Sequence, residues 1–309
     1  MELRSGDFAE VRRVQGERID LGSLRQILDQ AVTEGTSFWS YIALSSVHLS
    51  LEKSEQKGVE KLERETLEKL VKASARTFTV NRMKIEKLLE ELEGALISLG
   101  YEVRRVRAKL VSRGLFGVST SFGRVAFDIG LSFDPILNAP FIPASTIKGA
   151  VRSAYISLGG REEDAKRLFG SPEVGAGLVG FTDAYPVEAG EKGYILYPDV
   201  LTPHYRGART ELEAQPVPVT YLCVAPGTSF QFYVYFVPER GERKLKLEAG
   251  SDAAAEPKPE KSALGLVDLA VLYALYFGVG AKTSAGYSAL RAESYERVGR
   301  GNWARGLRG

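Results

Sequence analysis

A glycine-rich loop late in the chain carries the residues best suited to bind an anion. The loop GVGAKTSAGY, residues 278–287, presents one cation, Lys282, and two hydroxyl groups, Thr283 and Ser284, before it ends at Tyr287. Small residues let a polyanion approach the backbone N–H groups, while lysine and hydroxyl groups bind phosphate oxygens directly. We therefore predict that this loop contacts a nucleic-acid backbone, with Tyr287 either stacking on a base or filling a gap in the core.

Two common nucleotide-binding loops do not match this segment. The spacing G-x-x-x-x-G-K-[ST] requires glycine immediately before the lysine, where this chain has Ala281. The dinucleotide fingerprint requires a third glycine where this chain has Thr283. The apolar run before the loop, residues 266–277, also has the length and composition of a helix, not a strand. The sequence supports neither a nucleoside triphosphatase nor a Rossmann oxidoreductase.

A second group of anion-binding residues lies at the start of a predicted helix, STIKGAVRSAYISL. Ser145 or Thr146 could cap its first turn, with Lys148 in that turn and Arg152 one turn further on. A cation near a helix N-terminus is unfavourable by a few tenths of a kcal/mol or more, and a bound anion would reverse that effect. The alternative is a capped helix with two solvated cations, and the local sequence leaves both interpretations open.

Catalytic and metal-binding groups are sparse. His204, in PDVLTPHYRG, could act as a general acid or base in a metal-free ribonuclease, but no second histidine stands near it. We expect packing or an RNA-backbone contact for His204 instead. With the single Cys223 and two histidines, no zinc cluster is expected. Neither a cofactor nor a metal is predicted. Four aspartates stand apart from one another and resemble no paired metal-binding motif: Asp128, Asp134, Asp183 and Asp199.

The overall composition is that of a globular protein, with 309 residues, 44% hydrophobic, 26% charged and a formal net charge of +2. We expect a cytoplasmic protein with no membrane partner, because the chain has no long apolar run and no apolar signal core. The net charge alone does not indicate nucleic acid, but residues 103–124 contain cations and no acid. A strand with a basic face is predicted there, formed by Arg104, Arg107 and Lys109.

The elements that must position these residues form two regions. Leucines at three- and four-residue spacing in segments 60–78 and 81–100 predict a helical N-terminal region, residues 1–100, closed by Gly100. From residue 101 to 309 the order is strand, helix, strand, strand, helix, strand, with long insertions. This is the βαββαβ order of an α+β, ferredoxin-like fold, whose open sheet also serves in RNA-recognition domains. The charged and proline-containing segment 238–261 is predicted to be a mobile insertion.

Five blocks of sequence, in order between residues 141 and 287, resemble the RAMP superfamily of CRISPR-associated proteins. They are FIPASTIKGAVRSAY, LFGS, GLVGFTDAYP, DVLTPHYRG and GVGAKTSAGY. Within that superfamily the chain is most similar to the sixth-subunit family of Cmr complexes, the type III-B RNA-guided effectors. Two positions depart from the family pattern: Ser288 and Ala144 stand where glycine is frequent.

The resemblance implies a ferredoxin-like, RRM-like core and a non-catalytic RNA-binding subunit of a ribonucleoprotein complex that acts in antiviral defence. The implied partners are the guide (CRISPR) RNA, bound toward its 3′ end, the target RNA, and the other RAMP and small helical subunits. Guide phosphates would be bound by the helix start and the glycine loop, with the basic strand extending the track. The residues are Ser145, Thr146, Lys148, Arg152, Lys282, Thr283, Ser284, Tyr287, Arg104, Arg107, Lys109 and His204.

Two points stay open at the level of sequence. Either the hairpin before Pro143 or the segment around His204 could project into the guide–target duplex. The chain could also be a RAMP-type endoribonuclease that processes guide RNA, with His204 or Tyr205 as acid or base, or a purely protein–protein assembly subunit.

Overall fold

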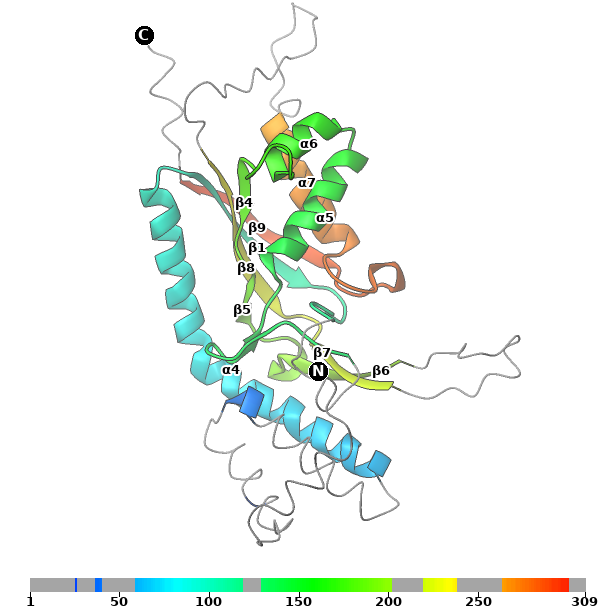
Figure 1. Cartoon of the computed structure of the whole chain (residues 1–309). Helices are drawn as coiled ribbons and strands as arrows, with labels where there is room; N and C mark the ends of the chain where they lie inside the picture. Colours follow the sequence, from blue (N-terminus) through cyan, green and yellow to red (C-terminus); the bar gives the residue numbers. More distant parts are fainter. Residues whose placement is uncertain are drawn as a thin grey trace, which may run out of the picture.

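The computed structural model describes residues 26, 37–40, 59–118, 129–201, 219–237 and 263–299. His204 and the predicted mobile insertion 238–261 lie outside the described residues. The elements, labelled as in Figure 1, are α4 (Val59–Ser98), β1 (Glu102–Leu110), β2 (Phe133–Asp134), β3 (Ala139–Pro140), α5 (Ala144–Ser157), α6 (Glu162–Phe169), β4 (Val179–Phe181), β5 (Tyr185–Glu188), η1 (Glu191–Gly193), β6 (Leu196–Leu201), β7 (Val219–Val224), β8 (Ser229–Phe236), α7 (Ala263–Phe277), η4 (Thr283–Ala285) and β9 (Leu290–Gly299).

The main sheet is antiparallel, in the order β4-β8-β1-β9, with β5 also paired to β8. One helix, α5, connects β1 to β4, and a second, α7, connects β8 to β9. Counted along the chain, the four core strands therefore lie side by side in the order second, third, first, fourth. This is the ferredoxin-like arrangement, so the predicted fold class is confirmed.

Helices cover both faces of this sheet. Helices α5, α6 and α7 form a layer on one face, and α4 lies across the other (Figure 1). The Tyr233 hydroxyl of β8 donates to the Leu89 carbonyl of α4 at 2.9 Å, and Arg105 of β1 donates to Glu93 of α4 at 2.6 and 2.7 Å. Strand β8 is accordingly buried on both faces. The sheet face that RNA-recognition domains leave open is therefore occupied by a helix.

The two predicted N-terminal helical segments form one continuous helix, α4, which bends near its middle (Figure 1). Side-chain hydrogen bonds to the helix backbone, from Thr79 to the Ala75 carbonyl and from Ser74 to the Val71 carbonyl, lie in the region of the bend. The helix ends at Ser98, and the predicted closing glycine, Gly100, follows in the left-handed conformation with a φ of 78°.

The apolar stripe of α4 shares one core with the sheet. Its buried residues include Phe78, Ile85, Leu89 and Leu96, which recur every four or seven residues and so lie on one helix face. The division of the chain into regions 1–100 and 101–309 stays a prediction, because the described parts of both regions bury their side chains together.

Two smaller ribbons complete the described structure. The predicted hairpin before Pro143 forms a short pairing of β2 with β3. Strands β6 and β7 pair over six residues each and form the second ribbon, called here the β6–β7 ribbon. The proline-containing β6 was not predicted as a strand. Among the described strands it pairs with β7 alone, and such an edge position tolerates Pro198.

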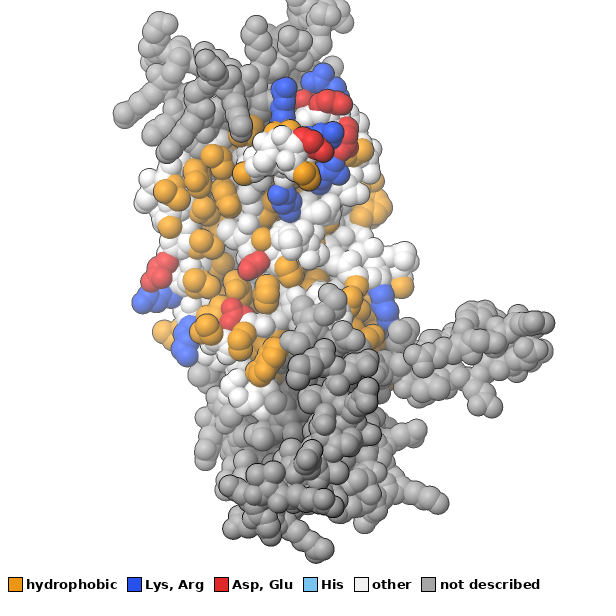
Figure 2. All heavy atoms as spheres, in the orientation of Figure 1, with side chains coloured by type: hydrophobic (Ala, Val, Ile, Leu, Met, Phe, Trp, Pro, Cys, Tyr) orange, Lys and Arg blue, Asp and Glu red, His pale blue; other side chains and the backbone are white. Residues whose placement is uncertain are grey.

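Charge and hydrophobicity on the visible face follow no single pattern. In the view of Figure 2, side chains of both signs gather over α6, and apolar and uncharged surface fills most of the remaining described face. Of the described helices, α4 is too polar and α7 too short to cross a bilayer, and no other one qualifies.

Candidate functional site

The glycine loop, Gly278–Tyr287, is held against the segment that follows β1. Its Ala281 amide donates to the Leu115 carbonyl at 2.9 Å, and the amide of Ser288 donates to the Arg113 carbonyl at 2.9 Å. A Cβ on Gly280, whose φ is 138°, would lie 2.7 Å from the Leu115 carbonyl oxygen. Glycine at 280 is therefore required by the turn and by the close approach of two backbones, whatever the loop binds.

Ser288 adopts the left-handed conformation that its place in the loop demands, with a φ of 61°. Its buried hydroxyl accepts the Leu115 amide at 3.0 Å and lies 3.4 Å from the Ala281 carbonyl, to which it donates. The conformation explains why glycine suits this position. The two hydrogen bonds of the serine hydroxyl offset the cost of the left-handed backbone, and glycine could not form them.

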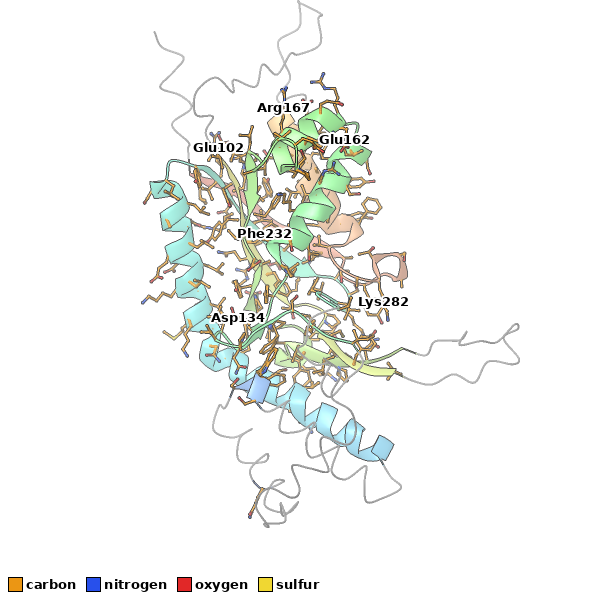
Figure 3. The ribbon with its side chains drawn as sticks, viewed as in Figure 1. Glu102, Asp134, Glu162, Arg167, Phe232 and Lys282 are labelled. Atoms are coloured by element: carbon orange, nitrogen blue, oxygen red, sulfur yellow. The ribbon has the colours of Figure 1, made fainter. Side chains whose placement is uncertain are left out.

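Lys282 lies at the start of η4 with its side chain between two tyrosine rings, in the position that Figure 3 labels. Its ammonium nitrogen is 4.9 Å from the ring centroid of Tyr221 and 5.3 Å from that of Tyr287, within the range of cation–π attraction. The Lys282 ammonium also donates to the Tyr221 hydroxyl at 3.2 Å. Tyr221 belongs to β7, so Lys282 connects the glycine loop with the β6–β7 ribbon.

Asp199 of β6 lies at the centre of this group and is buried. Its carboxylate accepts the hydroxyls of Tyr287 at 2.5 Å and Tyr221 at 2.9 Å, and the guanidinium of Arg113 at 2.7 Å. Asp199 and Tyr221 are directly opposite each other in the β6–β7 pairing. The role of Asp199 as the acceptor in this group was not predicted from the sequence. Local sequence held no signal for it, because its partners come from three other segments.

The group carries a surplus of positive charge. Arg113 and Lys282 supply two cations and Asp199 one anion, since burial and hydrogen bonding raise the pKa of Tyr221 and keep its phenol neutral. Burial is the largest influence on the pKa of Arg113 and lowers it, but the Asp199 carboxylate, Tyr287 and Cys223 together outweigh burial, so the pKa lies above its ordinary value. Beside these cations, Ser284 is exposed and Thr283 half-buried, and neither hydroxyl bonds to another described residue. This arrangement suits an anionic ligand.

The start of α5 differs from the sequence expectation. The helix begins at Ala144 with Pro143 as its N-cap residue, so the prediction that Ser145 or Thr146 caps it is wrong. Instead the Asp183 carboxylate accepts the Ala144 amide at 2.7 Å. An anion does occupy this helix end, but it belongs to the protein itself.

The two α5 cations have different surroundings. Arg152 forms an ion pair with Glu162 of α6, whereas Lys148 has no ion-pair partner among the described residues. Helices α5 and α7 pack antiparallel, so the start of α5 and the glycine loop after α7 lie at the same end of the helical layer (Figure 1). Lys148 and Lys282 are thus two cations at this end that form no ion pair with a described carboxylate.

The three cations predicted to form a basic face of β1 lie on two different faces of the strand. Arg104 points toward α7, contacts Glu102 at 2.6 Å and Asp268 at 3.4 Å, and lies over the Phe236 ring. Successive strand residues alternate between faces, so Arg107 and Lys109 lie with Arg105 on the α4 side. Their acidic partners are one residue of β5 and one of β9, Glu188 and Glu293. These ion pairs do not support the predicted contact of the three β1 cations with RNA.

Aspartates elsewhere have structural partners. Asp134 accepts the backbone amides of Ile136 and Leu137 at 2.8 and 2.9 Å and the hydroxyl of Tyr185 at 3.0 Å. The described residues contain no group of three histidine, cysteine or acidic side chains that could hold a metal ion. Burial raises the pKa of the Cys223 thiol to about 12, as expected of a small core residue.

Comparison with known proteins gives a consistent result. Residues 122–291 match the sequence profile of the RAMP superfamily. The protein described as CRISPR system CMR subunit Cmr6, from Saccharolobus solfataricus, is 36% identical over 247 residues, which cover 80% of this chain and 78% of that protein. In the cryo-EM structure of the type III-B Cmr-beta bound to cognate target RNA, a chain superposes with a TM-score of 0.70. Its identity is 30%, over 90% of this chain and 98% of that chain.

Proposed function

Because the chain belongs to the RAMP superfamily, we propose that it is an RNA-binding subunit of a type III-B CRISPR effector complex. The relative described as a Cmr subunit and the similar chain in a Cmr-beta structure that holds target RNA support this assignment. The proposal includes guide RNA bound toward its 3′ end, a part in seating target RNA, neighbouring RAMP and small helical subunits as partners, and a place in the cytoplasm.

The observation that carries the proposal is the surplus positive charge around Lys282. Its ammonium has three N–H groups, of which the described structure uses one, on the Tyr221 hydroxyl. The remaining two are available to phosphate oxygens, beside the Thr283 and Ser284 hydroxyls. Lys148 at the same end of the helical layer offers a second contact. Phosphate contacts of this kind hold RNA without reading its sequence, so guide bases stay free to pair.

We further propose that this site is not catalytic. Both oxygens of Asp199 are committed to hydrogen bonds, and Tyr221 is neutral because burial raises its pKa. Neither group is then free to take a proton from a ribose hydroxyl at neutral pH. Incubation of the purified protein with precursor guide RNA, with and without divalent metal, tests this point. Site-specific cleavage that is lost in a His204→Ala variant would favour an endoribonuclease instead.

Salt dependence of RNA binding tests the phosphate contacts. The dissociation constant for a single-stranded guide-length RNA should be measured between low and physiological salt for Lys282→Ala, Lys148→Ala and the double variant. Each lost contact should reduce the slope of log affinity against log salt by about 0.7. The matched control is Lys87→Ala on α4, which removes a charge whose side chain is 76% exposed and should leave the slope unchanged. A wild-type slope in the double variant would favour a purely protein–protein assembly role.

A further inference from the structure

We propose that Asp199 is a positioning residue that joins the β6–β7 ribbon to the glycine loop and sets the place of Lys282, so that ribbon and loop engage RNA as one unit. This inference rests on the proposed phosphate contact of Lys282. Asp199 itself does not touch Lys282 in the described structure. Its action is exerted through the two tyrosines and Arg113.

The Asp199 carboxylate is fully occupied. One oxygen, Oδ1, accepts Arg113 Nη1 at 2.7 Å and the Val200 amide at 2.9 Å. The other, Oδ2, accepts Tyr287 Oη at 2.5 Å and Tyr221 Oη at 2.9 Å. A carboxylate has about four acceptor sites, and here every one is used. Hydrogen bonds to a buried charge are the stronger kind, so this carboxylate fixes its donors firmly.

Its donors come from separate parts of the chain. Arg113 lies in the segment after β1, Tyr221 on β7 and Tyr287 at the end of the glycine loop. Backbone hydrogen bonds already hold the loop to the segment after β1. The ribbon is joined to that same segment by two backbone hydrogen bonds between Val224 of β7 and Gly114, at 2.8 and 3.0 Å. Hydrogen bonds between Asp199 and Tyr287 and between Tyr221 and Lys282 join the ribbon to the loop directly.

Counting protons gives the network a direction. Each phenol has one hydrogen, and the two hydroxyls both lie within donor distance of Asp199 Oδ2. The Tyr221 hydroxyl also lies 3.3 Å from the Tyr287 oxygen, but its contact with the charged carboxylate is shorter, at 2.9 Å, and therefore takes the hydrogen. With its hydrogen directed at Asp199, the Tyr221 oxygen presents its lone pairs to the Lys282 ammonium, 3.2 Å away. Loss of the carboxylate charge would free the Tyr221 hydroxyl to rotate, and Lys282 would lose a fixed acceptor. The ring faces that flank the ammonium would also lose their anchor.

A similar carboxylate elsewhere shows what a purely structural role looks like. Asp268 of α7 accepts the Tyr295 hydroxyl at 2.6 Å and contacts Arg104 at 3.4 Å, so it too binds a tyrosine and an arginine. No lysine of the described structure contacts that group, and it lies in the N-terminal half of α7, away from the glycine loop. Asp268→Asn is therefore a chemically matched control for Asp199→Asn.

The test is a double-mutant cycle on RNA affinity, with wild type, Asp199→Asn, Lys282→Ala and the double variant in the full-length chain. If Asp199 positions Lys282, the fold-loss caused by Lys282→Ala should shrink by at least about 2-fold in the Asp199→Asn background. The same fold-loss should be unchanged in the Asp268→Asn background. Tyr287→Phe keeps the carboxylate and deletes one hydroxyl, and in this background too the fold-loss caused by Lys282→Ala should be smaller. This variant replaces Asp199→Asn in the cycle if Asp199→Asn does not fold.

Hydrogen exchange supplies a readout that does not depend on RNA. Without RNA, Asp199→Asn should raise amide exchange in the β6–β7 ribbon and in the glycine loop together, whereas Asp268→Asn should not. With bound RNA, the wild-type ribbon should become more protected along with the loop, because coupling between two sites is reciprocal.

The outcomes separate this inference from the proposed function. If Lys282→Ala alone leaves RNA affinity unchanged, the phosphate contact fails and the positioning role falls with it. If Lys282→Ala weakens binding but its effect is fully additive with Asp199→Asn and with Tyr287→Phe, the proposed function stands and Asp199 is not a positioning residue. If Asp199→Asn speeds amide exchange in the ribbon but not in the glycine loop, Asp199 does not join the two segments.

Discussion

Ser288, which stands where glycine is frequent in the family, offers a direct test of the contacts that hold the glycine loop. Replacing Ser288 by alanine removes the hydroxyl and keeps the left-handed backbone, whereas replacing it by glycine removes the hydroxyl and relieves that backbone. Both changes leave the buried Leu115 amide without the acceptor that now lies 3.0 Å away. The pair of variants therefore separates the contribution of the hydrogen bond from the cost of the conformation.

The magnitudes follow from these contacts. A buried donor left without a partner costs about 1–3 kcal/mol, which is the expected loss of stability for Ser288→Ala. The left-handed conformation costs a residue other than glycine about 1–2 kcal/mol, and one buried carbon contributes about 0.8 kcal/mol. Ser288→Gly avoids the cost of the left-handed conformation but loses the contribution of the buried carbon. It should be more stable than the alanine variant by roughly 0.2–1.2 kcal/mol.

Urea denaturation followed by circular dichroism measures both differences, provided that the slope with denaturant is the same for all variants. Ser229→Ala is the matched control, because Ser229 is also fully buried but its hydroxyl has no hydrogen-bond partner among the described residues. That variant should be as stable as wild type or slightly more stable. The reasoning is refuted if Ser288→Ala is as stable as wild type, or if Ser288→Gly is the less stable of the two.

Three further predictions concern the core and its charges. Leu89→Ala on α4 should lower the free energy of unfolding by about 2–5 kcal/mol. Replacing the exposed Met83 by alanine should change that free energy by less than about 0.5 kcal/mol. Equal effects of the two variants in urea denaturation would contradict the packing of α4 on the sheet. Arg104→Met should cost about 3 kcal/mol or more by the same measurement, because it leaves the buried Glu102 without one of its two cations. Burial raises the pKa values of Cys223 and Tyr233 to about 12. Since the unfolded values are about 8.5 and 10, stability from these groups is complete below pH of about 8.5 and falls as pH rises toward 12. Unfolding curves that do not change between pH 8 and 11 would contradict this.

The sequence predicts much of the fold because its main elements carry their own signals. Helix α5 has an apolar face at helical spacing, and α7 is almost wholly apolar before a glycine-rich turn. The order of strands and helices then selects the ferredoxin-like arrangement. Strand β6 was missed because Pro198 and Asp199 are atypical of strands, and its pairing with β7 is fixed by a segment about twenty residues further along.

The site is less predictable, because its contacts join distant positions. Lys282 and Tyr287 could be singled out by type and setting, but the carboxylate that organises them is 88 residues from Tyr287. The cap of α5 was assigned wrongly for the same reason, since Asp183, 39 residues after Ala144, accepts the amide that a local hydroxyl was expected to bind. The cations of β1 look like a basic face only because their acidic partners lie on β5, β9 and α7.

The packing of α4 against the sheet also has a consequence for synthesis of the chain. Leu89 of α4 accepts a hydrogen bond from Tyr233 of β8, and the two residues are 144 positions apart. At a translation rate of about 5–20 residues per second, α4 leaves the ribosome roughly 7–30 s before the strand on which it packs. During that interval its apolar stripe has no sheet to cover it. A nascent chain stalled before β8 should therefore bind a chaperone or aggregate, and one stalled after β9 should not.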